Sequence, residues 1–295
     1  MYETILIPTD GSAHAERAAR HARSLVEAFD ATVTVLGVAD LQRAAGAFSA
    51  GGVDEAFRER VRSESRSAVG DTAALVDDRV PVETAVVDGD PAEAIVDYAE
   101  EGDFDAVAMG THGRRGLSRL VFGSVARYVL RHTTRPVLTA RESDADLVTD
   151  YGDVLVPTDG SGAAEAAVGH GVAVAAAFDA TLHAFHVVDL GGMATGSGVE
   201  PPTGQLDRYT EAGEEAVRAV AERARAEGVE ATTTVAHGFP SADLLEYVED
   251  SGIDLVAMGT HGRTGLDRVL LGSTTERVVS RSPVPVLAVH PDEGE

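Results

Sequence analysis

The sequence predicts an α/β fold: two tandem, doubly wound parallel sheets of the Rossmann-like kind, five-stranded, each with strand order 3-2-1-4-5. The first observation behind this prediction is an internal repeat, since ILIPTDGS at Ile5 returns as VLVPTDGS at Val154. Likewise, DAVAMGTHGR at Asp105 returns as DLVAMGTHGR at Asp254. The second observation is that short, β-branched apolar runs alternate with segments of helical periodicity in each copy. Apolar strands separated by helices indicate a parallel sheet that is covered on both faces.

The two copies keep the same spacing from end to end, which indicates two domains of equal size. We expect domain 1 at residues 1–141, a linker at residues 142–152 and domain 2 at residues 153–295. The fifth strand of each copy is apolar, and an uncovered apolar edge invites aggregation. We therefore expect the two fifth strands to pack together. The chain would then be a pseudo-twofold, covalent pseudo-dimer, with a further homodimer left open.

Five strands are predicted in the first copy, each from a short apolar, β-branched run. They cover residues 4–8, 32–38, 82–87, 105–109 and 136–140. The first helix, residues 12–29, places its Ala, Leu and Val side chains on one face. The second covers residues 53–76, and the loop before it is rich in glycine and alanine (residues 44–52).

The two remaining helices are predicted from their start signals. Asp90 is the expected N-cap of the third helix and Pro91 its first residue, a position that proline favours. The fourth helix covers residues 124–132, and Ser124 is its expected N-cap. In the second copy Ser273 is the expected N-cap, and Glu276 would complete a capping box with it.

The charge is strongly acidic: 49 acidic residues stand against 24 basic ones, all of them Arg, for a formal net charge of -25. Such a chain resembles proteins of halophilic archaea, and an acidic surface that only aids solubility is the alternative. Nucleic acid is an unexpected partner because phosphate backbones need a basic face. The segment MYETILIPTD lacks a secretion signal, and no run is apolar enough to cross a bilayer. With no Cys present, we expect a cytoplasmic protein without disulfides or membrane contact.

Two glycine-rich segments follow the strands that flank the switch point of the predicted sheet, where ligands bind in such folds. One is Pro-Thr-Asp-Gly-Ser, residues 8–12. The other runs from Gly110 through Gly113 to Gly123-Ser124. Glycines let the backbone approach a ligand closely or take a positive φ, and a helix N-terminus offers unpaired N–H groups to phosphate. Arg114 could add a bidentate phosphate contact.

The spacing Gly-2x-Gly-9x-Gly-Ser, together with Pro-Thr-Asp-Gly-Ser, resembles the universal stress protein family, and more narrowly its ATP-binding branch in tandem arrangement. The resemblance covers nearly the whole chain and implies ATP as ligand, with room for Mg²⁺ on the phosphates. The site residues it implies in the first copy are Pro8, Thr9, Asp10 and Val38 at the adenine and ribose end and Met109, Gly110, His112, Gly113, Arg114, Gly123, Ser124 and Val125 at the ribose and phosphates. The matching set in the second copy is Pro157, Thr158, Asp159, Val187, Met258, Gly259, His261, Gly262, Arg263, Gly272, Ser273 and Thr274.

The resemblance implies a nucleotide-dependent regulator in the stress response rather than an enzyme, because no general base is evident beside the γ-phosphate. No catalytic residue and no metal ligand is assigned. Two alternatives stay open: a slow ATP hydrolase or phosphotransferase, and an interaction scaffold that binds no nucleotide. Asp10 could also be a turn residue that bonds its own backbone, and His112 and His261 could be packed or solvated rather than catalytic. His183 and His186 would point to opposite faces of one strand, which makes them a poor metal pair.

Overall fold

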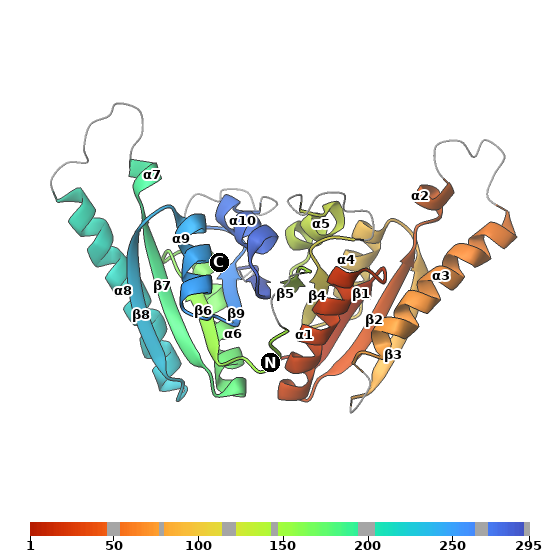
Figure 1. Cartoon of the computed structure of the whole chain (residues 1–295), viewed down its shortest axis with the longest axis horizontal. Helices are drawn as coiled ribbons and strands as arrows, with labels where there is room; N and C mark the ends of the chain where they lie inside the picture. The colour runs from red at the N-terminus through yellow and green to blue at the C-terminus, as the bar shows by residue number, and fades with distance from the viewer. Residues whose placement is uncertain are drawn as a thin grey trace. The chain divides into compact units, whose positions relative to one another are not determined.

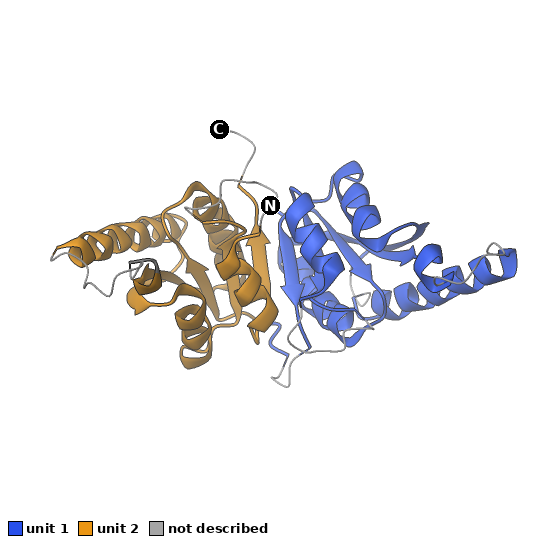
Figure 2. Ribbon diagram, turned by 90° about the horizontal axis from the view of Figure 1, so that it is seen from above, with its two compact units in different colours: residues 1–149 blue, residues 150–295 orange. Residues whose placement is uncertain are grey.

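The computed structural model describes residues 1–45, 54–76, 80–113, 122–142, 147–193, 204–262 and 271–291. The chain divides into two compact units, Met1–Thr149 and Asp150–Glu295 (Figure 2). Each unit is a doubly wound α/β fold, as predicted. The expected packing of one fifth strand on the other stays a prediction.

The sheet of unit 1 has the strand order β3-β2-β1-β4-β5, which is the predicted 3-2-1-4-5 (Figure 1). All neighbouring strands are parallel; Thr4 lies opposite Thr32, and Ile5 lies opposite Ala106. The strands are β1 (Thr4–Thr9), β2 (Thr32–Ala39), β3 (Val82–Asp88), β4 (Ala106–Gly110) and β5 (Val137–Ala140). The central strands β1, β2 and β4 are mostly buried, which explains their continuous apolar runs.

Helices cover both faces of this sheet. α1 packs on β1, β4 and β5 and α3 on β2 and β3, while α4 and α5 pack against each other on the opposite face. The helices are α1 (Ala13–Phe29), α2 (Leu41–Ala45), α3 (Glu55–Ala73), α4 (Pro91–Glu101) and α5 (Ser124–His132). The predicted N-cap of α4 is confirmed, since Asp90 Oδ1 accepts the N–H of Ala92 at 2.8 Å.

Unit 2 repeats this arrangement with the order β8-β7-β6-β9-β10. Its strands are β6 (Asp153–Pro157), β7 (Thr181–Asp189), β8 (Ala231–Gly238), β9 (Leu255–Gly259) and β10 (Val286–Val289). Its helices are α6 (Gly162–Phe178), α7 (Leu190–Met193), α8 (Gln205–Ala226), α9 (Pro240–Asp250) and α10 (Ser273–Arg281). The short helices α2 and α7 were not predicted, and most of the loop predicted at residues 44–52 lies outside the described residues.

The N-caps predicted for α5 and α10, Ser124 and Ser273, are wrong by one residue. Gly123 and Gly272 are the N-caps, and neither has a side-chain cap hydrogen bond. Each glycine donates its N–H to the carbonyl of the threonine that follows the preceding strand, at 3.0 and 2.8 Å, which fixes its extended backbone before the helix. The serines are therefore the first helical residues, and the capping box with Glu276 is wrong as well.

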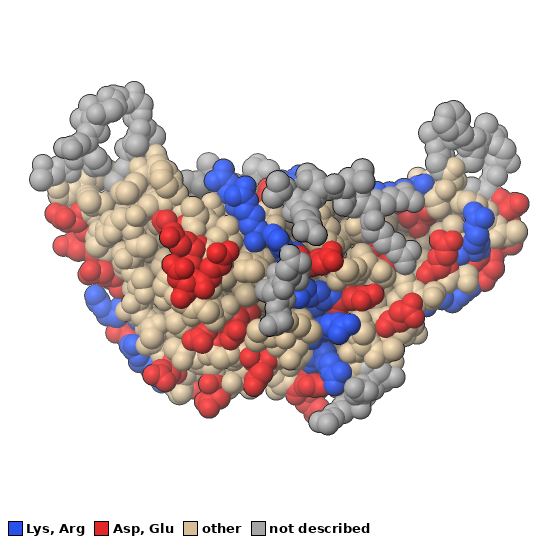
Figure 3. Space-filling view, in the orientation of Figure 1, with Lys and Arg blue, Asp and Glu red and all other residues tan. Residues whose placement is uncertain are grey.

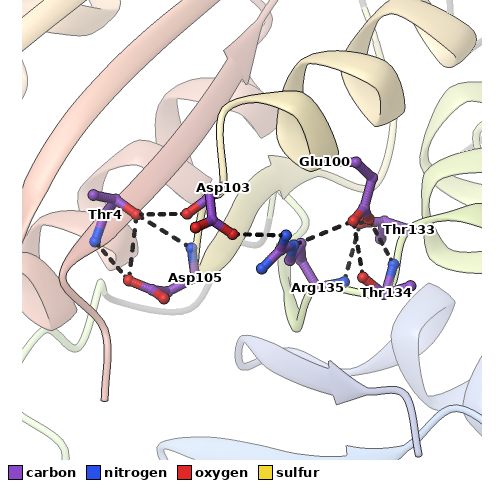
Figure 4. A network of polar contacts seen from close by, with 7 residues as sticks. All are labelled: Thr4, Glu100, Asp103, Asp105, Thr133, Thr134 and Arg135. Atoms are coloured by element: carbon purple, nitrogen blue, oxygen red, sulfur yellow. Dashed lines mark hydrogen bonds and ion pairs between the residues drawn. The ribbon is translucent and has the colours of Figure 1, made fainter. Parts of the chain in front are cut away.

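A polar network joins the amino ends of the unit 1 strands, at the edge opposite the glycine-rich segments (Figure 4). Asp105 Oδ2 accepts the N–H of Thr4 at 2.9 Å and ties β1 to β4. Glu100 accepts hydrogen bonds from Thr133 Oγ1 and from the N–H of Thr134, both at 2.7 Å. Arg135 contacts the same carboxylate at 3.3 Å. The network therefore fixes α4 to the turn before β5.

The hydrogen bonds to Glu100 also set its ionisation. Partial burial alone would raise the pKa of this carboxyl. The hydrogen bonds from Thr133 and Thr134, with the charge of Arg135, outweigh burial and lower the pKa below its ordinary value. The carboxylate is thus the form that the fold stabilises.

The surface carries the acidic excess of the sequence. Asp and Glu side chains are scattered over the visible face, with Arg side chains between them (Figure 3). No helix within the described ranges is both long enough and apolar enough to cross a membrane.

Candidate functional site

The carboxyl ends of β1, β2 and β4 in unit 1 border a cavity of about 740 Å³. This is the switch point of the sheet, where the chain leaves neighbouring strands toward opposite faces. The cavity is lined by every described member of the first predicted set: Pro8, Thr9, Asp10, Val38, Met109, Gly110, His112, Gly113, Gly123, Ser124 and Val125. Arg114, the remaining member, lies outside the described residues. The predicted residues thus lie together, and their use in binding a ligand stays a prediction.

Asp10 has both a turn role and a place in the cavity wall. Its Oδ1 accepts the N–H of Ser12 at 3.0 Å, the local turn that an aspartate favours. Ser12 then caps α1, since its Oγ accepts the N–H of Ala15 at 3.3 Å. The Oδ2 of Asp10 faces Gly113, where an added Cβ would lie 2.6 Å from it. The turn fixes the backbone and leaves the second oxygen toward the glycine loop.

The glycines of the loop are needed for close approach rather than for a positive φ, because neither Gly110 nor Gly123 has one. A Cβ on Gly110 would lie 2.7 Å from the carbonyl carbon of His14, in the first turn of α1. A Cβ on Gly123 would lie 2.7 Å from the carbonyl oxygen of Thr111. Both contacts are to backbone atoms, which move little. Glycine at these positions therefore lets the loop close against α1 and against itself.

The first turn of α5 faces the cavity, since residues from Gly123 to Arg127 line it. A helix N-terminus carries the positive end of the helix dipole and offers backbone N–H groups. Arg127 adds a full positive charge on the same turn, and its guanidinium carbon lies 5.7 Å from the centre of the Phe122 ring. This side of the cavity is therefore suited to an anion.

Two histidines face each other beside the cavity, His14 on α1 and His112 in the loop, with ring centres 4.9 Å apart. His112 is buried, and its Nδ1 lies 3.0 Å from Thr111 Oγ1. His14 Nδ1 accepts the N–H of Glu142 at 2.7 Å, which requires an unprotonated nitrogen. Burial and the neighbouring His112 lower the pKa of His14, although the carboxylates of Glu142 and Asp10 oppose them. The neutral form of His14 is therefore the one that this environment favours.

Sequence reasoning missed the cavity wall that α3 supplies. Val61, Glu64, Ser65 and Ala68 all line the cavity, and the Ser65 hydroxyl contacts the carbonyl oxygen of Val38 at 3.5 Å. The spacing of these residues marks one face of a helix, a signal that was available. Whether this face of α3 lies over the cavity depends on the angle at which α3 crosses the sheet. The periodicity of the sequence does not determine that angle.

Unit 2 repeats the contacts around the corresponding aspartate. Asp159 Oδ1 accepts the N–H of Ser161 at 3.0 Å, and a Cβ on Gly262 would lie 2.8 Å from Asp159 Oδ2. The described members of the second predicted set lie in the carboxyl-terminal parts of β6, β7 and β9, shortly after β6 and β9, or at the start of α10: Pro157, Thr158, Asp159, Val187, Met258, Gly259, His261, Gly262, Gly272, Ser273 and Thr274. Arg263 lies outside the described residues.

The second unit differs behind these residues. His186 of β7 is buried, and its Nδ1 lies 2.7 Å from the carbonyl oxygen of Thr158, so this nitrogen donates. In α10, the Thr275 hydroxyl donates to the carbonyl oxygen of Gly259 at 2.9 Å. In unit 1 the residue corresponding to His186 is Gly37, and the residue corresponding to Thr275 is Ala126. The surroundings of the two candidate sites are therefore unlike.

In the part of the chain that the structure describes, no three His, Asp or Glu side chains form a group that could hold a metal ion. The predicted orientation of the strand histidines is confirmed. His183 Nε2 lies 2.8 Å from Asp153 and its Nδ1 lies 3.0 Å from the Tyr247 hydroxyl of α9. His186 points the other way, toward Gly213 of α8.

The model of the universal stress protein family matches residues 1–141 and 150–290. Universal stress protein MJ0531 of Methanocaldococcus jannaschii is 36% identical over 149 residues, which cover 49% of this chain and 85% of that protein. A universal stress protein of Mycolicibacterium smegmatis is 28% identical over 297 residues, 97% of each chain. The crystal structure of a universal stress protein from Archaeoglobus fulgidus has a TM-score of 0.74 at 23% identity and covers 99% of this chain and 97% of its own. This likeness supports the fold.

Proposed function

Since the chain belongs to the universal stress protein family, we propose that its first unit binds ATP and acts as a nucleotide-dependent regulator in the stress response. The observation that carries the proposal is the cavity of about 740 Å³ at the switch point, lined by every described residue of the predicted set. Its volume falls within the usual range for small-molecule sites. The cavity also combines the three kinds of surface that an adenine nucleotide needs.

Each part of the nucleotide has a matching part of the wall. Apolar side chains such as Leu36 and Val38 suit the adenine ring. The Asp10 carboxylate would accept hydrogen bonds from ribose hydroxyls. Arg127 and the uncapped start of α5 would hold the phosphates. Mg²⁺ would be bound through the phosphates and would screen their charge there.

We propose binding without catalysis, in the cytoplasm. Asp10, the one carboxylate in the motif, is held in a turn by Ser12 and faces Gly113. A group held in this way would position a ligand rather than abstract a proton. The equivalent contacts of Asp159 in unit 2 support a second site of the same kind.

Calorimetric titration of the purified full chain with Mg-ATP would test the proposal. We expect Gly113→Ala to weaken binding by roughly tenfold or more, because the new methyl group would displace the Asp10 carboxylate. Gly70→Ala is the matched control, since nothing lies within 4 Å of a Cβ there. No heat of binding in the wild-type chain would reject nucleotide binding and leave the scaffold alternative. Phosphate release above background would favour the hydrolase.

The same titration should be repeated across KCl concentrations. A net charge of -25 repels ATP in dilute buffer. At ~1 M salt the Debye length is about 3 Å, so only the groups next to the phosphates remain effective. We expect affinity and folding to improve between low and molar KCl. Affinity that falls steadily with added salt would contradict a site built from local amides and arginine.

A further inference from the structure

The first turns of α5 and α10 carry charges of opposite sign. In α5, the backbone N–H of Arg127 donates to the carbonyl of the N-cap glycine at 2.9 Å. In α10, the N–H of Glu276 makes the same bond at 2.8 Å, so the two residues occupy equivalent positions. Whatever else each side chain contacts, the formal charge at this position is positive in unit 1 and negative in unit 2. The helix start that suits an anion in unit 1 therefore carries an anionic side chain in unit 2.

The other arginine of the unit 1 cavity is also replaced in unit 2. Among the described residues that line the cavity, the arginines are Arg43 and Arg127. By the constant spacing of the repeat, Arg43 corresponds to Gly192, which has no side chain. Arg114 and Arg263 are arginine in both units, so they do not distinguish the two. Unit 2 thus has neither of the two positive charges that the described wall of the first cavity contains.

The acidic residues of the wall recur in unit 2, so they do not offset this change. Asp10 recurs as Asp159. Asp40 recurs as Asp189, and each accepts a backbone N–H of the short helix that follows it, at 2.8 and 2.9 Å. Glu64 lies on α3, and the first half of α8, the corresponding helix, is acidic as well. The surroundings of the second candidate site are therefore more negative than those of the first.

The features that suit a sugar and a base are the same in both units. Asp159 Oδ1 accepts the N–H of Ser161 at 3.0 Å, as in the first unit, and its Oδ2 faces Gly262. The apolar residues Leu36 and Val38 of β2 have apolar counterparts, Phe185 and Val187 of β7. The part of the site that differs is the part that suits phosphates.

We propose that the two units bind different ligands of one class: unit 1 an adenine nucleotide with its chain of phosphates, and unit 2 an adenine nucleoside without phosphates. The inference rests on the proposed function and assigns the ligand of the second site. Arg127 would pair with phosphate oxygens, whereas Glu276 would repel them. In molar salt the Debye length is about 3 Å, so a charge next to the phosphates has more effect than the net charge of the chain. An uncharged nucleoside would meet neither the attraction nor the repulsion.

Calorimetric titration of the full chain in molar KCl would test the assignment. We expect Mg-ATP to occupy a single site, and adenosine to bind at a second site in the chain that is already saturated with Mg-ATP. Gly262→Ala should weaken this adenosine binding, because the new methyl group would displace the Asp159 carboxylate. Absence of Mg-ATP binding would reject the proposed function itself. Two Mg-ATP sites of equal affinity, or no adenosine binding to the Mg-ATP complex, would overturn this inference and leave the proposed function intact.

Two charge reversals test the residues that make the difference. Glu276→Arg should raise the affinity of unit 2 for Mg-ATP by roughly tenfold or more, so that a second Mg-ATP site becomes measurable. Arg127→Glu should weaken the binding of Mg-ATP to unit 1 by a similar factor, and more than it weakens the binding of adenosine. Circular dichroism would verify that both variants fold.

Glu249→Arg is the matched control for Glu276→Arg, since it changes the net charge equally at an exposed residue near the end of α9, which leads into the amino end of β9. If this control also produces a second Mg-ATP site, the net charge sets the affinity and the inference is wrong. A folded Glu276→Arg chain that still binds Mg-ATP at a single site would equally overturn it. Equal weakening of Mg-ATP and adenosine by Arg127→Glu would show that Arg127 does not act on the phosphates.

Discussion

Gly37 of unit 1 and His186 of unit 2 occupy the same place in the repeat, on the strands β2 and β7. A Cβ on Gly37 would lie 2.7 Å from Cγ2 of Val69 in α3. In unit 2 the glycine is on the helix instead, and a Cβ on Gly213 would lie 2.4 Å from Cδ2 of His186. The space between strand and helix is filled in both units, from the helix in one and from the strand in the other. Close packing therefore constrains the pair of residues and not either residue alone.

The contacts next to the candidate sites differ much less. Asp10 and Asp159 accept the N–H two residues further on at 3.0 Å in both units. Gly123 and Gly272 have nearly the same backbone angles, with φ of -63° and -60°. The sites repeat while their supports have diverged. Substitutions at equivalent supporting positions should therefore change the free energy of unfolding unequally in the two units. Three pairs of equivalent residues test this expectation.

The largest difference is expected at Glu100 and its counterpart Glu249. Glu100→Gln should lower the free energy of unfolding by about 3 kcal/mol, because the carboxylate accepts three hydrogen bonds from Thr133 and Thr134. Glu249 is exposed, and the residue equivalent to Thr134 is Pro283, which has no N–H. Glu249→Gln should therefore change stability by less than about 0.5 kcal/mol. Urea unfolding at fixed KCl measures both, and equal losses would remove the contrast.

The second pair is His21 of α1 and His170 of α6. Burial, with a smaller effect of Arg17, lowers the pKa of His21 to about 3 from the ordinary 6.5. The unfolded chain then binds the proton more readily, so this contribution to stability is complete above pH 6.5 and is lost as the pH falls toward 3. The expected loss is ~1.4 kcal/mol per pH unit, or about 2 kcal/mol at pH 5.

The unfolding free energy of wild-type and His21→Gln chains between pH 7 and pH 5 would measure this loss. Other ionisable groups also contribute to the pH dependence. The quantity to compare is therefore the difference in unfolding free energy between wild type and His21→Gln at each pH. His170 is only half-buried, and His170→Gln supplies the control at the equivalent position. A pH slope that is the same in wild type and His21→Gln would show that His21 does not set it.

The strands and the main helices could be predicted because the signals are local. Short apolar runs that alternate with helical segments indicated the strands. Asp90 followed by Pro91 indicated the first residue of α4 correctly. The same reasoning failed at Ser124, since the N-cap is set by a hydrogen bond from Gly123 to Thr111, a contact made across the loop. A serine near a helix start shows where the helix begins and not which residue caps it.

The site could be predicted only in part, for a related reason. The residues that follow β1 and β4 share a sequence motif, and the topology alone brings them together. Arg127 and the α3 residues Val61 and Glu64 enter the cavity because of how their helices cross the sheet. The exchange between Gly37 and His186 was not interpretable from the strand, because its reason lies on the facing helix.

The smallest expected difference lies at the starts of α4 and α9. Asp90 Oδ1 accepts the N–H of Ala92, whereas the N-cap of α9 is Phe239, which is 63% exposed and makes no side-chain cap. Asp90→Ala should cost about 1 kcal/mol. Phe239→Asp should gain only about half of that, because Asp243 already lies in the first turn of α9 and would repel a second carboxylate. Phe239→Ala separates the cap from loss of the ring, and thermal unfolding in molar KCl compares the three. If Phe239→Asp is no more stable than Phe239→Ala, a capping side chain adds nothing at the start of α9. Asp243 would then already stabilise the start of α9 as Asp90 stabilises that of α4.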